Sequence, residues 1–520
     1  MHIADMNKKF VALCVLLIAL AGCAKRDSFA PGYDYKIDLT AIDNDELLVE
    51  LSFHGHSDDA SRFCLPKIVP GIYDALDYGK FVDGLAAFDS RGRALAVSQL
   101  DPNCWEIAGV QGGVTLKYNV NDGWERFDFE GIRPYRSSES HFDRSVVILN
   151  ANSVFEYFVQ NEHLPFRISV MKPERFFGAT SLTKTKSAKN EDRYLAPNYR
   201  ALVDSPMLYA PADAVTLKLP GIRVEVAAYS TSGKQIAAEL ARHIEPLVKN
   251  QIEYLGGKLA TDTYTFIIYH AENQEDGRSF ADGLEHNQST LVLIYAPLDM
   301  EVLKSHVFNL VSHEFFHTLI PLGLRSHELA NFDFNHPRFS KHLWLYEGMT
   351  EYFTVHMPVK QKMVTLAEFI RTIESKIAAM RRFDNSEPFT ELSKNVLSRS
   401  DQYMNVYFKG ALINLCLDIE LRRLSDGAYG VQDLVLDLAK KYGRDKPFND
   451  DELFDEIHEI TGHPEVREFI ARYIEGEEEL PLEEALQYVG LDLDIETGRI
   501  AEIEGMSEAQ RRLRMSWIDQ

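Results

Sequence analysis

The sequence predicts a multidomain protein with an N-terminal β-sandwich, a central domain of mixed strands and helices, and a helical C-terminal region. Its 520 residues exceed what one ordinary hydrophobic core organises. Short alternating strands fill the first part of the chain, whereas longer helical patterns dominate after Leu343. With 45% hydrophobic and 26% charged residues, the composition is that of a globular protein.

Alternation of apolar and polar residues predicts the β-sandwich. It is clearest at residues 47–53, 114–120 and 215–219, and turn signals such as Pro70-Gly71 and Arg91-Gly92 punctuate the region. We therefore predict a β-sandwich domain over residues 24–220.

The period of the pattern changes after residue 220. A helical segment at 235–254 precedes two apolar strands, 264–269 and 290–295, and further helices follow at 366–383, 407–424 and 431–442. The acidic run 475–479 reads as a solvated linker. These patterns predict a central domain at 221–356, a helical part at 357–480 and a short tail at 481–520.

The first 23 residues form a predicted targeting signal. Lys8 and Lys9 precede an apolar run, residues 10–21, that is short for a membrane-spanning helix. The run ends in Leu20-Ala-Gly-Cys23, which resembles a bacterial lipobox. The resemblance implies cleavage before Cys23, acylation of that residue and attachment to a membrane of the cell envelope. Ala24, where an aspartate would favour the inner membrane, points to the outer membrane facing the periplasm; the alternative is a cleaved signal without lipid.

The cysteines and the net charge indicate which structural roles and which binding partners to expect. Cys64 and Cys104 share the N-terminal region, and the sequence leaves open whether they form a disulfide. Cys416 lies in an apolar run and is expected in a core. A net charge of −24 argues against binding to nucleic acid, whose phosphates require a basic surface.

The stretch Val311-Ser-His-Glu-Phe-Phe-His-Thr-Leu319 contains the pattern H-E-x-x-H. On a helix, His313 and His317 share one face and can hold a single Zn²⁺ ion, with Glu314 placed beside it as a general base. An apolar stripe upstream and Pro321 downstream favour a helix that ends near His317.

A catalytic zinc ion needs a third protein ligand. The sequence excludes the metzincin class, because Ile320 and Gly323 occupy the positions where that class requires glycine and histidine. The better candidate is Glu347 in the apolar segment 343–353, since a buried acid is costly unless it is paired or metal-bound. Glu351 follows one turn later and is a candidate to orient a ligand histidine. Rival ligands in or beside the connecting loop are the histidines at positions 327, 336 and 342.

Together these segments resemble the glycyl aminopeptidase family of gluzincin zinc metallopeptidases. The resemblance extends to residues 65–73, 202–206, 282–289 and 407–410. It implies a thermolysin-like α+β catalytic domain, one zinc ion held by His313, His317 and Glu347, and Glu314 as the general base. Two departures stand out: too few residues follow 491 to build the PDZ domain common in the family, and the segment after His317 lacks the expected tryptophan and basic residues.

The resemblance to gluzincin aminopeptidases implies roles for two further site residues. Tyr407, before a Phe-Lys-Gly sequence, is expected to donate a hydrogen bond to the oxyanion, with Tyr403 as the nearby rival. Glu285, in the substrate-binding segment that includes Gly283, is expected to bind the α-ammonium group of a peptide.

The leading hypothesis is thus a lipid-anchored zinc aminopeptidase that acts on peptides with small N-terminal residues, glycine or alanine. One alternative is a zinc endopeptidase of broader specificity. Another is a non-catalytic peptide-binding lipoprotein that keeps the fold, although retention of Glu314 argues against it because metal binding alone needs no general base.

Overall fold

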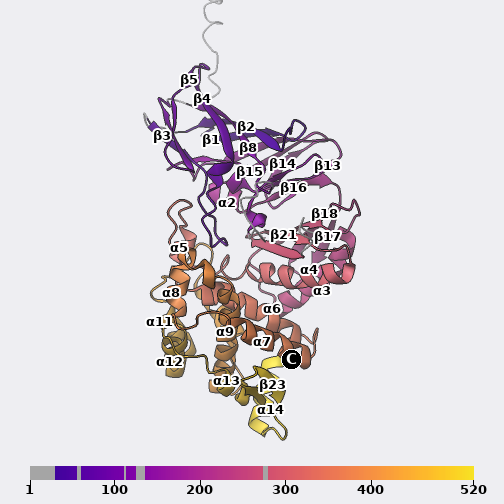
Figure 1. Cartoon of the computed structure of the whole chain (residues 1–520), viewed down its shortest axis with the longest axis vertical. Coiled ribbons are helices and arrows are strands. Elements are labelled where there is room, and N and C mark those ends of the chain that lie inside the picture. The colour runs from indigo at the N-terminus through magenta and orange to yellow at the C-terminus, as the bar shows by residue number, and fades with distance from the viewer. Residues whose placement is uncertain (1–29, 56–59, 111–112, 125–134, 273–278, 520) are drawn as a thin grey trace, which may run out of the picture.

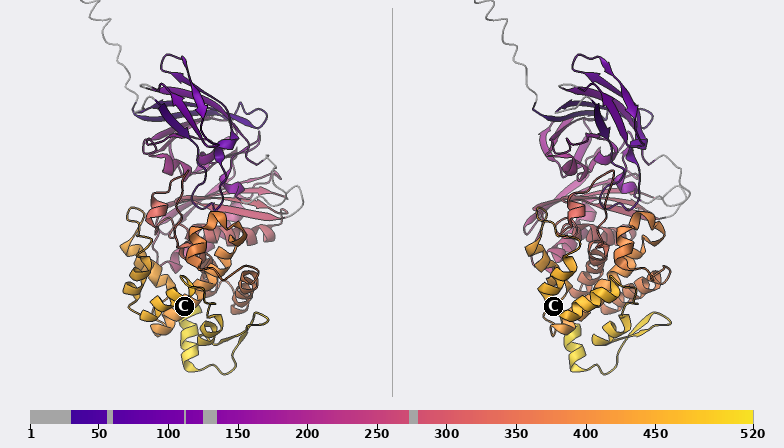
Figure 2. Two further views of the ribbon diagram at one scale, coloured as in Figure 1. Left: turned by 60° about the vertical axis from the view of Figure 1, so that its left-hand side comes forward. Right: turned by 90° about the vertical axis from the view of Figure 1, so that its left-hand side faces the viewer.

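A computed structural model describes residues 30–55, 60–110, 113–124, 135–272 and 279–519. Figure 1 shows three levels along the longest axis: N-terminal sheets, a further sheet with its helices, and a C-terminal helical body. The two additional views in Figure 2 keep the same order, with the N-terminal sheets and the C-terminal helices at opposite ends. The predicted signal and Cys23 lie outside the described residues.

The N-terminal region is rich in sheet, as predicted. Its eight-stranded sheet has the order β14-β15-β12-β1-β2-β8-β4-β5, and two four-stranded sheets have the orders β11-β3-β7-β6 and β13-β16-β10-β9. The strands of the large sheet are β1 (Gly32–Asp38), β2 (Glu46–His54), β4 (Val82–Asp89), β5 (Ala94–Leu95), β8 (Val114–Asn121), β12 (Phe166–Met171), β14 (Thr183–Ser187) and β15 (Glu191–Ala196). Those of the smaller sheets are β3 (Ala60–Cys64), β6 (Val97–Gln99), β7 (Cys104–Ala108), β11 (Tyr157–Phe158), β9 (His141–Phe142), β10 (Val147–Leu149), β13 (Phe176–Thr180) and β16 (Met207–Pro211).

Alternating burial along these strands explains how the layers pack. Every second residue of β2 from Leu47 onward is buried, because side chains on a strand point to opposite faces in turn. Phe53 of β2 contacts Phe158 of β11 across the layers, with ring centroids 4.5 Å apart. Cys64 and Cys104 pair across β3 and β7 and form a disulfide, which settles the question left open by the sequence. Short helical turns connect the strands: η1 (Tyr78–Phe81), η2 (Arg136–Ser138), η3 (Ala151–Ser153) and α2 (Tyr199–Val203).

A five-stranded sheet follows, in the order β17-β18-β19-β21-β20. Its strands are β17 (Ala214–Leu219), β18 (Ile222–Ser230), β19 (Thr263–Ala271), β20 (Phe280–Glu285) and β21 (Ser289–Tyr295). Residues 215–219, predicted to belong to the β-sandwich, instead pair with β18 in this sheet. The boundary at 220 therefore falls inside a hairpin, and the change of sheet lies before Ala214; alternation predicts a strand but not its partner.

Two helices lie against this sheet, α3 (Ala237–Tyr254) and α4 (Met300–Phe316), which contact one another. The side chain of Asp299 caps α4 by accepting hydrogen bonds from the backbone N–H groups of Glu301 and Val302. After α5 (His327–Ala330), the π-helical turn η4 (Trp344–Gly348) runs directly into α6 (Met349–Lys360).

The C-terminal region is helical and surrounds α9, most of whose residues are buried. Its elements are α7 (Leu366–Met380), α8 (Phe389–Lys394), η5 (Val396–Ser398), η6 (Ser400–Gln402), α9 (Asn405–Leu424), α10 (Val431–Lys441), α11 (Leu453–Thr461), α12 (Pro464–Tyr473), α13 (Leu482–Tyr488), β22 (Leu491–Asp494), β23 (Arg499–Glu502) and α14 (Glu508–Ile518). The predicted helices at 366–383, 407–424 and 431–442 correspond to α7, α9 and α10. No helix in the described ranges is long and apolar enough to span a membrane.

The segment predicted as a tail is part of this helical body. Trp517 of α14 is fully buried, and its indole N–H donates to the hydroxyl of Tyr352 on α6 over 2.9 Å. The ring of His356, also on α6, bonds to the carbonyl of Trp517 at 2.8 Å, and Arg422 of α9 donates to the carbonyl of Ser516 at 2.7 Å. Beyond Gly490 the described residues form the β22–β23 hairpin and α14, with no PDZ-like sheet.

Candidate metal centre and active site

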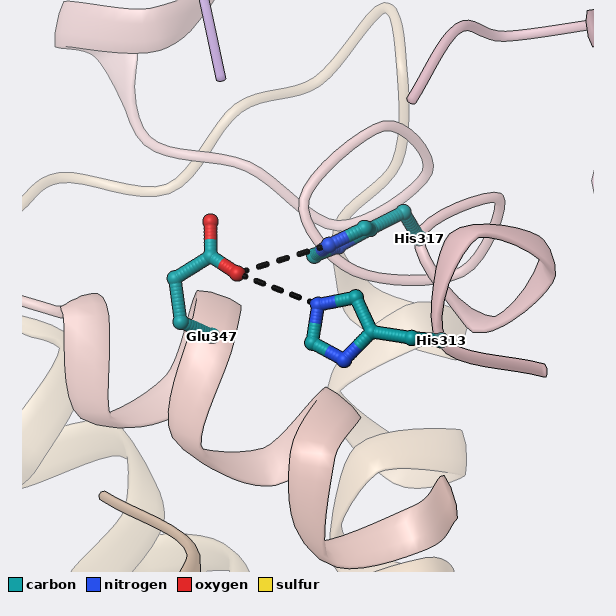
Figure 3. Close-up of side chains that lie close together, drawn as sticks. All are labelled: His313, His317 and Glu347. Carbon is teal, nitrogen blue, oxygen red and sulfur yellow. Dashed lines mark hydrogen bonds and ion pairs between the residues drawn. The ribbon is translucent and has the colours of Figure 1, made fainter. Parts of the chain in front are cut away.

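The two histidines of the H-E-x-x-H pattern lie at the end of α4, on one face. The backbone N–H of His317 donates to the carbonyl of His313 over 3.4 Å, so the one-turn spacing holds although His317 is the C-cap. Both side chains are buried. Their Nε2 atoms face the same oxygen, Oε2 of Glu347, at 3.3 Å from His313 and 3.5 Å from His317 (Figure 3).

Each histidine is oriented through its other ring nitrogen. Nδ1 of His313 lies 2.8 Å from Oε2 of Glu351, and Nδ1 of His317 lies 2.8 Å from the carbonyl oxygen of Ile320. A carbonyl oxygen only accepts hydrogen bonds, so Nδ1 of His317 carries the proton. In the neutral ring Nε2 then has a free lone pair, which is the form that binds a metal ion.

Glu351 is itself held in place by a lysine. The Nζ atom of Lys376 on α7 forms a short ion pair with Oε1 of Glu351, and both side chains lie mostly inside the protein. Burial opposes ionisation of Glu351, but Lys376 and His313 outweigh it and lower its pKa to about 2. A charged carboxylate therefore supports His313 from behind, as the spacing of Glu351 suggested.

Glu347 lies on the π-helical turn η4, a local geometry that often occurs at functional sites. While Oε2 faces the histidines, Oε1 accepts a hydrogen bond of 2.6 Å from the hydroxyl of Tyr73. The following residue, Gly348, touches the backbone of α9 so closely that an added Cβ would lie 2.7 Å from the Cα atom of Gly410. This contact fixes the distance between η4 and the helix that carries Tyr407.

Glu314 points into the site beside the histidines. It is 5% exposed, and within the described part of the chain its Oε2 atom has no hydrogen-bond partner. A Cβ added to Gly283 on β20 would lie 2.8 Å from Oε1 of Glu314, so only glycine leaves room for this carboxylate. Burial raises the pKa of Glu314 to about 8, although His313 and His317 favour the charged form.

Glu285, at the end of β20, is a second acidic side chain beside Glu314 and His317. Ligand atoms of Glu285, Glu314 and His317 all lie within 4.8 Å of one another. The carboxylate also packs against Gly71, where an added Cβ would lie 2.5 Å from Oε2 of Glu285. Burial raises the pKa of Glu285, with His317 acting in the opposite direction.

Tyr407 lies over His313, with ring centroids 5.7 Å apart. Its hydroxyl is 2.8 Å from that of Tyr403, so both tyrosines reach the site and share one hydrogen bond. Burial and the nearby Glu347 carboxylate raise the pKa of Tyr407 well above its usual range. The phenol therefore keeps its proton and remains a hydrogen-bond donor.

A cleft of about 600 Å³ opens at these residues. Gly283, His313, Glu314, Tyr403 and Tyr407 line its polar part. The remaining wall is largely apolar and includes Phe280, Phe308, Val355, Phe369, Met404 and Phe408. A larger cleft of about 710 Å³ lies next to the Cys64–Cys104 disulfide, away from the histidine pair.

The rival histidine ligands lie elsewhere. The ring of His342 bonds to the carbonyl of Asp450 at 2.8 Å and accepts from the indole N–H of Trp344. His327 begins the short helix α5, and His336 lines the cleft near the disulfide. None of the three belongs to a potential metal-binding group among the described residues.

Sequence reasoning missed Tyr73 and Lys376 as members of this site. Tyr73 belongs to the N-terminal region and lies 274 positions before Glu347. Its segment, residues 65–73, carried part of the family resemblance, and that was the available signal. Nothing in the sequence marked Lys376, a single lysine on an amphipathic helix.

The donor set fits a zinc ion. Two imidazole nitrogens and one carboxylate oxygen are typical zinc ligands, and bonds of about 2.0 Å in tetrahedral geometry separate neighbouring donors by about 3.3 Å. The observed separations from Glu347 are 3.3 and 3.5 Å. Burial disfavours a charged His317, yet Glu347 and Glu285 raise its pKa to about 9, so the surroundings favour positive charge.

Comparison with known families decides the relationship. The Peptidase M61 N-terminal domain matches residues 34–211, and the M61 glycyl aminopeptidase matches residues 306–413. Together the two matches span more than half of the chain and include both histidines and Glu347. The chain belongs to the M61 glycyl aminopeptidase family. It is therefore a peptidase, as the resemblance implied.

Solved structures show the same fold at low sequence identity. An aminopeptidase N family protein from Idiomarina loihiensis matches with a TM-score of 0.77 and 22% identity, over 89% of this chain and 79% of that one. An M1 zinc metallopeptidase from Deinococcus radiodurans matches with a TM-score of 0.53 and 13% identity, over 87% of this chain and 95% of that one. At these identities the likeness concerns the fold alone. No curated protein matches the sequence.

Proposed function

We propose that this M61 family member is a zinc-dependent aminopeptidase that removes small N-terminal residues, glycine or alanine, from peptides. The observation that carries the proposal is a pair of carboxylates next to the histidine pair: ligand atoms of Glu285 and Glu314 lie within 4.8 Å of each other and of His317. Glu314 is buried, and its Oε2 atom has no hydrogen-bond partner among the described residues. One carboxylate suits proton transfer and the other suits recognition of a free α-ammonium group.

His313, His317 and Glu347 would hold the zinc ion in a thermolysin-like, gluzincin arrangement. Zinc bound there supplies Lewis-acid chemistry, which polarises the scissile carbonyl and acidifies water. Glu314 accepts the proton of the attacking water and delivers it to the leaving amine. Its free oxygen and the space left by Gly283 support this role.

The remaining residues stabilise charge and orient the peptide. The hydroxyl of Tyr407, kept protonated by burial, donates to the developing oxyanion. Glu285 accepts a charge-assisted hydrogen bond from the α-ammonium group, which restricts cleavage to the first residue. β20, which carries Gly283 and Glu285, is the edge strand of its sheet and can align an extended substrate backbone.

A comparison of free and blocked peptides tests the proposal. Zinc-loaded protein should cleave glycyl and alanyl peptides, lose activity with a chelator and regain it with zinc. Glu314→Gln should lower kcat by at least about 10²-fold while zinc remains bound. Similar rates on N-acetylated peptides would replace the proposal with an endopeptidase. Absence of zinc-dependent turnover on any peptide would favour a non-catalytic binding protein.

We also propose that Cys23 carries the lipid anchor and that the protein faces the periplasm from the outer membrane. The Cys64–Cys104 disulfide supports an oxidising compartment. Cys23→Ser should move the protein from the membrane fraction to the soluble periplasmic fraction. Unchanged membrane association of the variant would refute the anchor.

A further inference from the structure

The N-terminal region contributes a side chain to the metal centre. Tyr73 is 7% exposed, and its hydroxyl donates to Oε1 of Glu347 over 2.6 Å. The phenol of Tyr73 carries a proton and a carboxylate oxygen accepts, so Tyr73 is the donor of this bond. The hydrogen bond occupies the one carboxylate oxygen that does not face the histidines.

The position of Tyr73 is set from both sides of the domain boundary. The backbone N–H groups of Lys67 and Ile68 donate to the carbonyl of Phe334 over 3.0 and 3.1 Å, and Phe334 precedes η4. The ring of Tyr73 lies 5.8 Å from that of Tyr403, between centroids. These contacts hold the ring of Tyr73 beside Glu347.

We propose that Tyr73 is a positioning residue that makes Glu347 a monodentate ligand, one that binds the metal through a single oxygen. With Oε1 bound to the tyrosine, only Oε2 is free to face His313 and His317. A coordination position of the metal then stays open for water or substrate, whereas a bidentate carboxylate would occupy it. The inference rests on the proposed function for its catalytic meaning, but its geometry concerns metal binding alone.

The same turn restrains Glu285. Gly71 has a φ of +84°, a backbone conformation that favours glycine, and an added Cβ would lie 2.5 Å from Oε2 of Glu285. Gly71 and Tyr73 therefore contact two carboxylates beside the histidine pair, those of Glu285 and Glu347. The β-rich N-terminal region becomes a wall of the active site.

Removal of one oxygen atom tests the proposal. Tyr73→Phe should weaken zinc binding by about 10–100-fold in competition with a chelator, because the partner of the ligand is lost. In the cobalt-substituted protein, Tyr73→Phe should weaken the visible absorption bands, since the freed oxygen raises the coordination number. With glycyl peptides kcat should fall about tenfold or more while KM changes little, because the hydroxyl of Tyr73 acts through the ligand Glu347.

Tyr199→Phe is the matched control. Tyr199 is a fully buried tyrosine of the same region whose hydroxyl donates to the carbonyl of Phe155 over 2.9 Å, away from the metal centre. It should leave zinc affinity and the cobalt spectrum unchanged. Equal zinc affinity and equal cobalt spectra for wild type and Tyr73→Phe would overturn the proposal, as would equal losses in both variants.

A second pair of variants tests the contact between Gly71 and Glu285. Gly71→Ala should raise KM for peptides with a free N-terminus by about tenfold or more, because its Cβ displaces the Glu285 carboxylate. Gly84→Ala carries a similar backbone strain, at φ +67°, but its Cβ meets nothing within 4 Å, so KM should be unchanged. An unchanged KM for Gly71→Ala would contradict the contact.

Failures of the two proposals are distinguishable. If the wild type binds no zinc or cleaves no peptide, the proposed function fails. If the wild type does both and Tyr73→Phe behaves identically, only the positioning role of Tyr73 fails.

Discussion

The contact between Gly348 and Gly410 provides the sharpest test of how the site is built. In Gly348→Ala the new Cβ would lie 2.7 Å from both the Cα and the carbonyl carbon of Gly410. Carbon atoms in ordinary contact are about 3.5–4.0 Å apart, so η4 and α9 must separate by about 1 Å. Both contacting atoms belong to backbone, and no flexible side chain can absorb the change.

The expected cost has two parts. Overpacking costs about 1–3 kcal/mol, and the higher helix propensity of alanine offsets about 0.5–1 kcal/mol of it, so we expect a net loss of about 1–2 kcal/mol. Glu347 and Tyr407 lie on the two elements that separate. A misplacement of about 1 Å between catalytic groups costs on the order of 10²-fold in kcat.

The assay combines kcat on a glycyl peptide with the Tm of the zinc-loaded protein. Gly410→Ala places a Cβ 2.7 Å from the Cα of Gly348 and should give a similar loss from the other side. Gly443→Ala meets nothing within 4 Å and serves as the control. If Gly348→Ala retained the kcat and Tm of the control, the close approach would not be what fixes the two helices.

Three further predictions concern single side chains. Tyr407→Phe should lower kcat by about 10²–10³-fold with little change in zinc affinity, measured by steady-state kinetics; a larger loss for Tyr403→Phe would transfer the oxyanion role to that residue. Glu351→Gln should weaken zinc binding by about 10–100-fold in chelator competition, because the charged acceptor of His313 is lost, and unchanged affinity would contradict its orienting role. Glu156 is fully buried, its carboxylate oxygens have no partner among the described residues, and burial raises its pKa. The folded state therefore holds more protons than the unfolded state above the ordinary pKa of glutamate, and the free energy of unfolding falls as pH rises. Above the ordinary pKa of glutamate, the free energy of unfolding of the wild type should fall by about 1.4 kcal/mol per pH unit relative to that of Glu156→Gln. Chemical unfolding at several pH values measures this difference. Parallel pH profiles for the two proteins would refute a protonated Glu156.

Local patterns in the sequence predicted the parts of the site that lie on single elements. The one-turn spacing of His313 and His317 shows their common face, because helical periodicity is a property of neighbouring residues. The isolated acid in an apolar helix identified Glu347 as a candidate, and the structure places its carboxylate beside both rings. The assignment of roles to these residues remains a proposal.

Features that depend on distant pairing were not predictable. Tyr73 reaches Glu347 across 274 positions, and no local period encodes such a contact. The strand at 215–219 was recognised, but its partner was not, since register with β18 depends on the whole sheet. The buried position of Trp517 depends in the same way on α6 and α9.

The hydrogen bonds that join Trp517 and Ser516 to α6 and α9 also affect when the fold can be completed during synthesis of the chain. α6 continues directly from η4 and carries Glu351, so the helix behind the histidines is completed by residues that a ribosome adds more than a hundred positions later. A nascent chain that stops short of Trp517 lacks this closing layer, although every proposed catalytic residue has already been synthesised. A chain truncated before Ser516 should therefore lose peptidase activity although it contains every proposed catalytic residue.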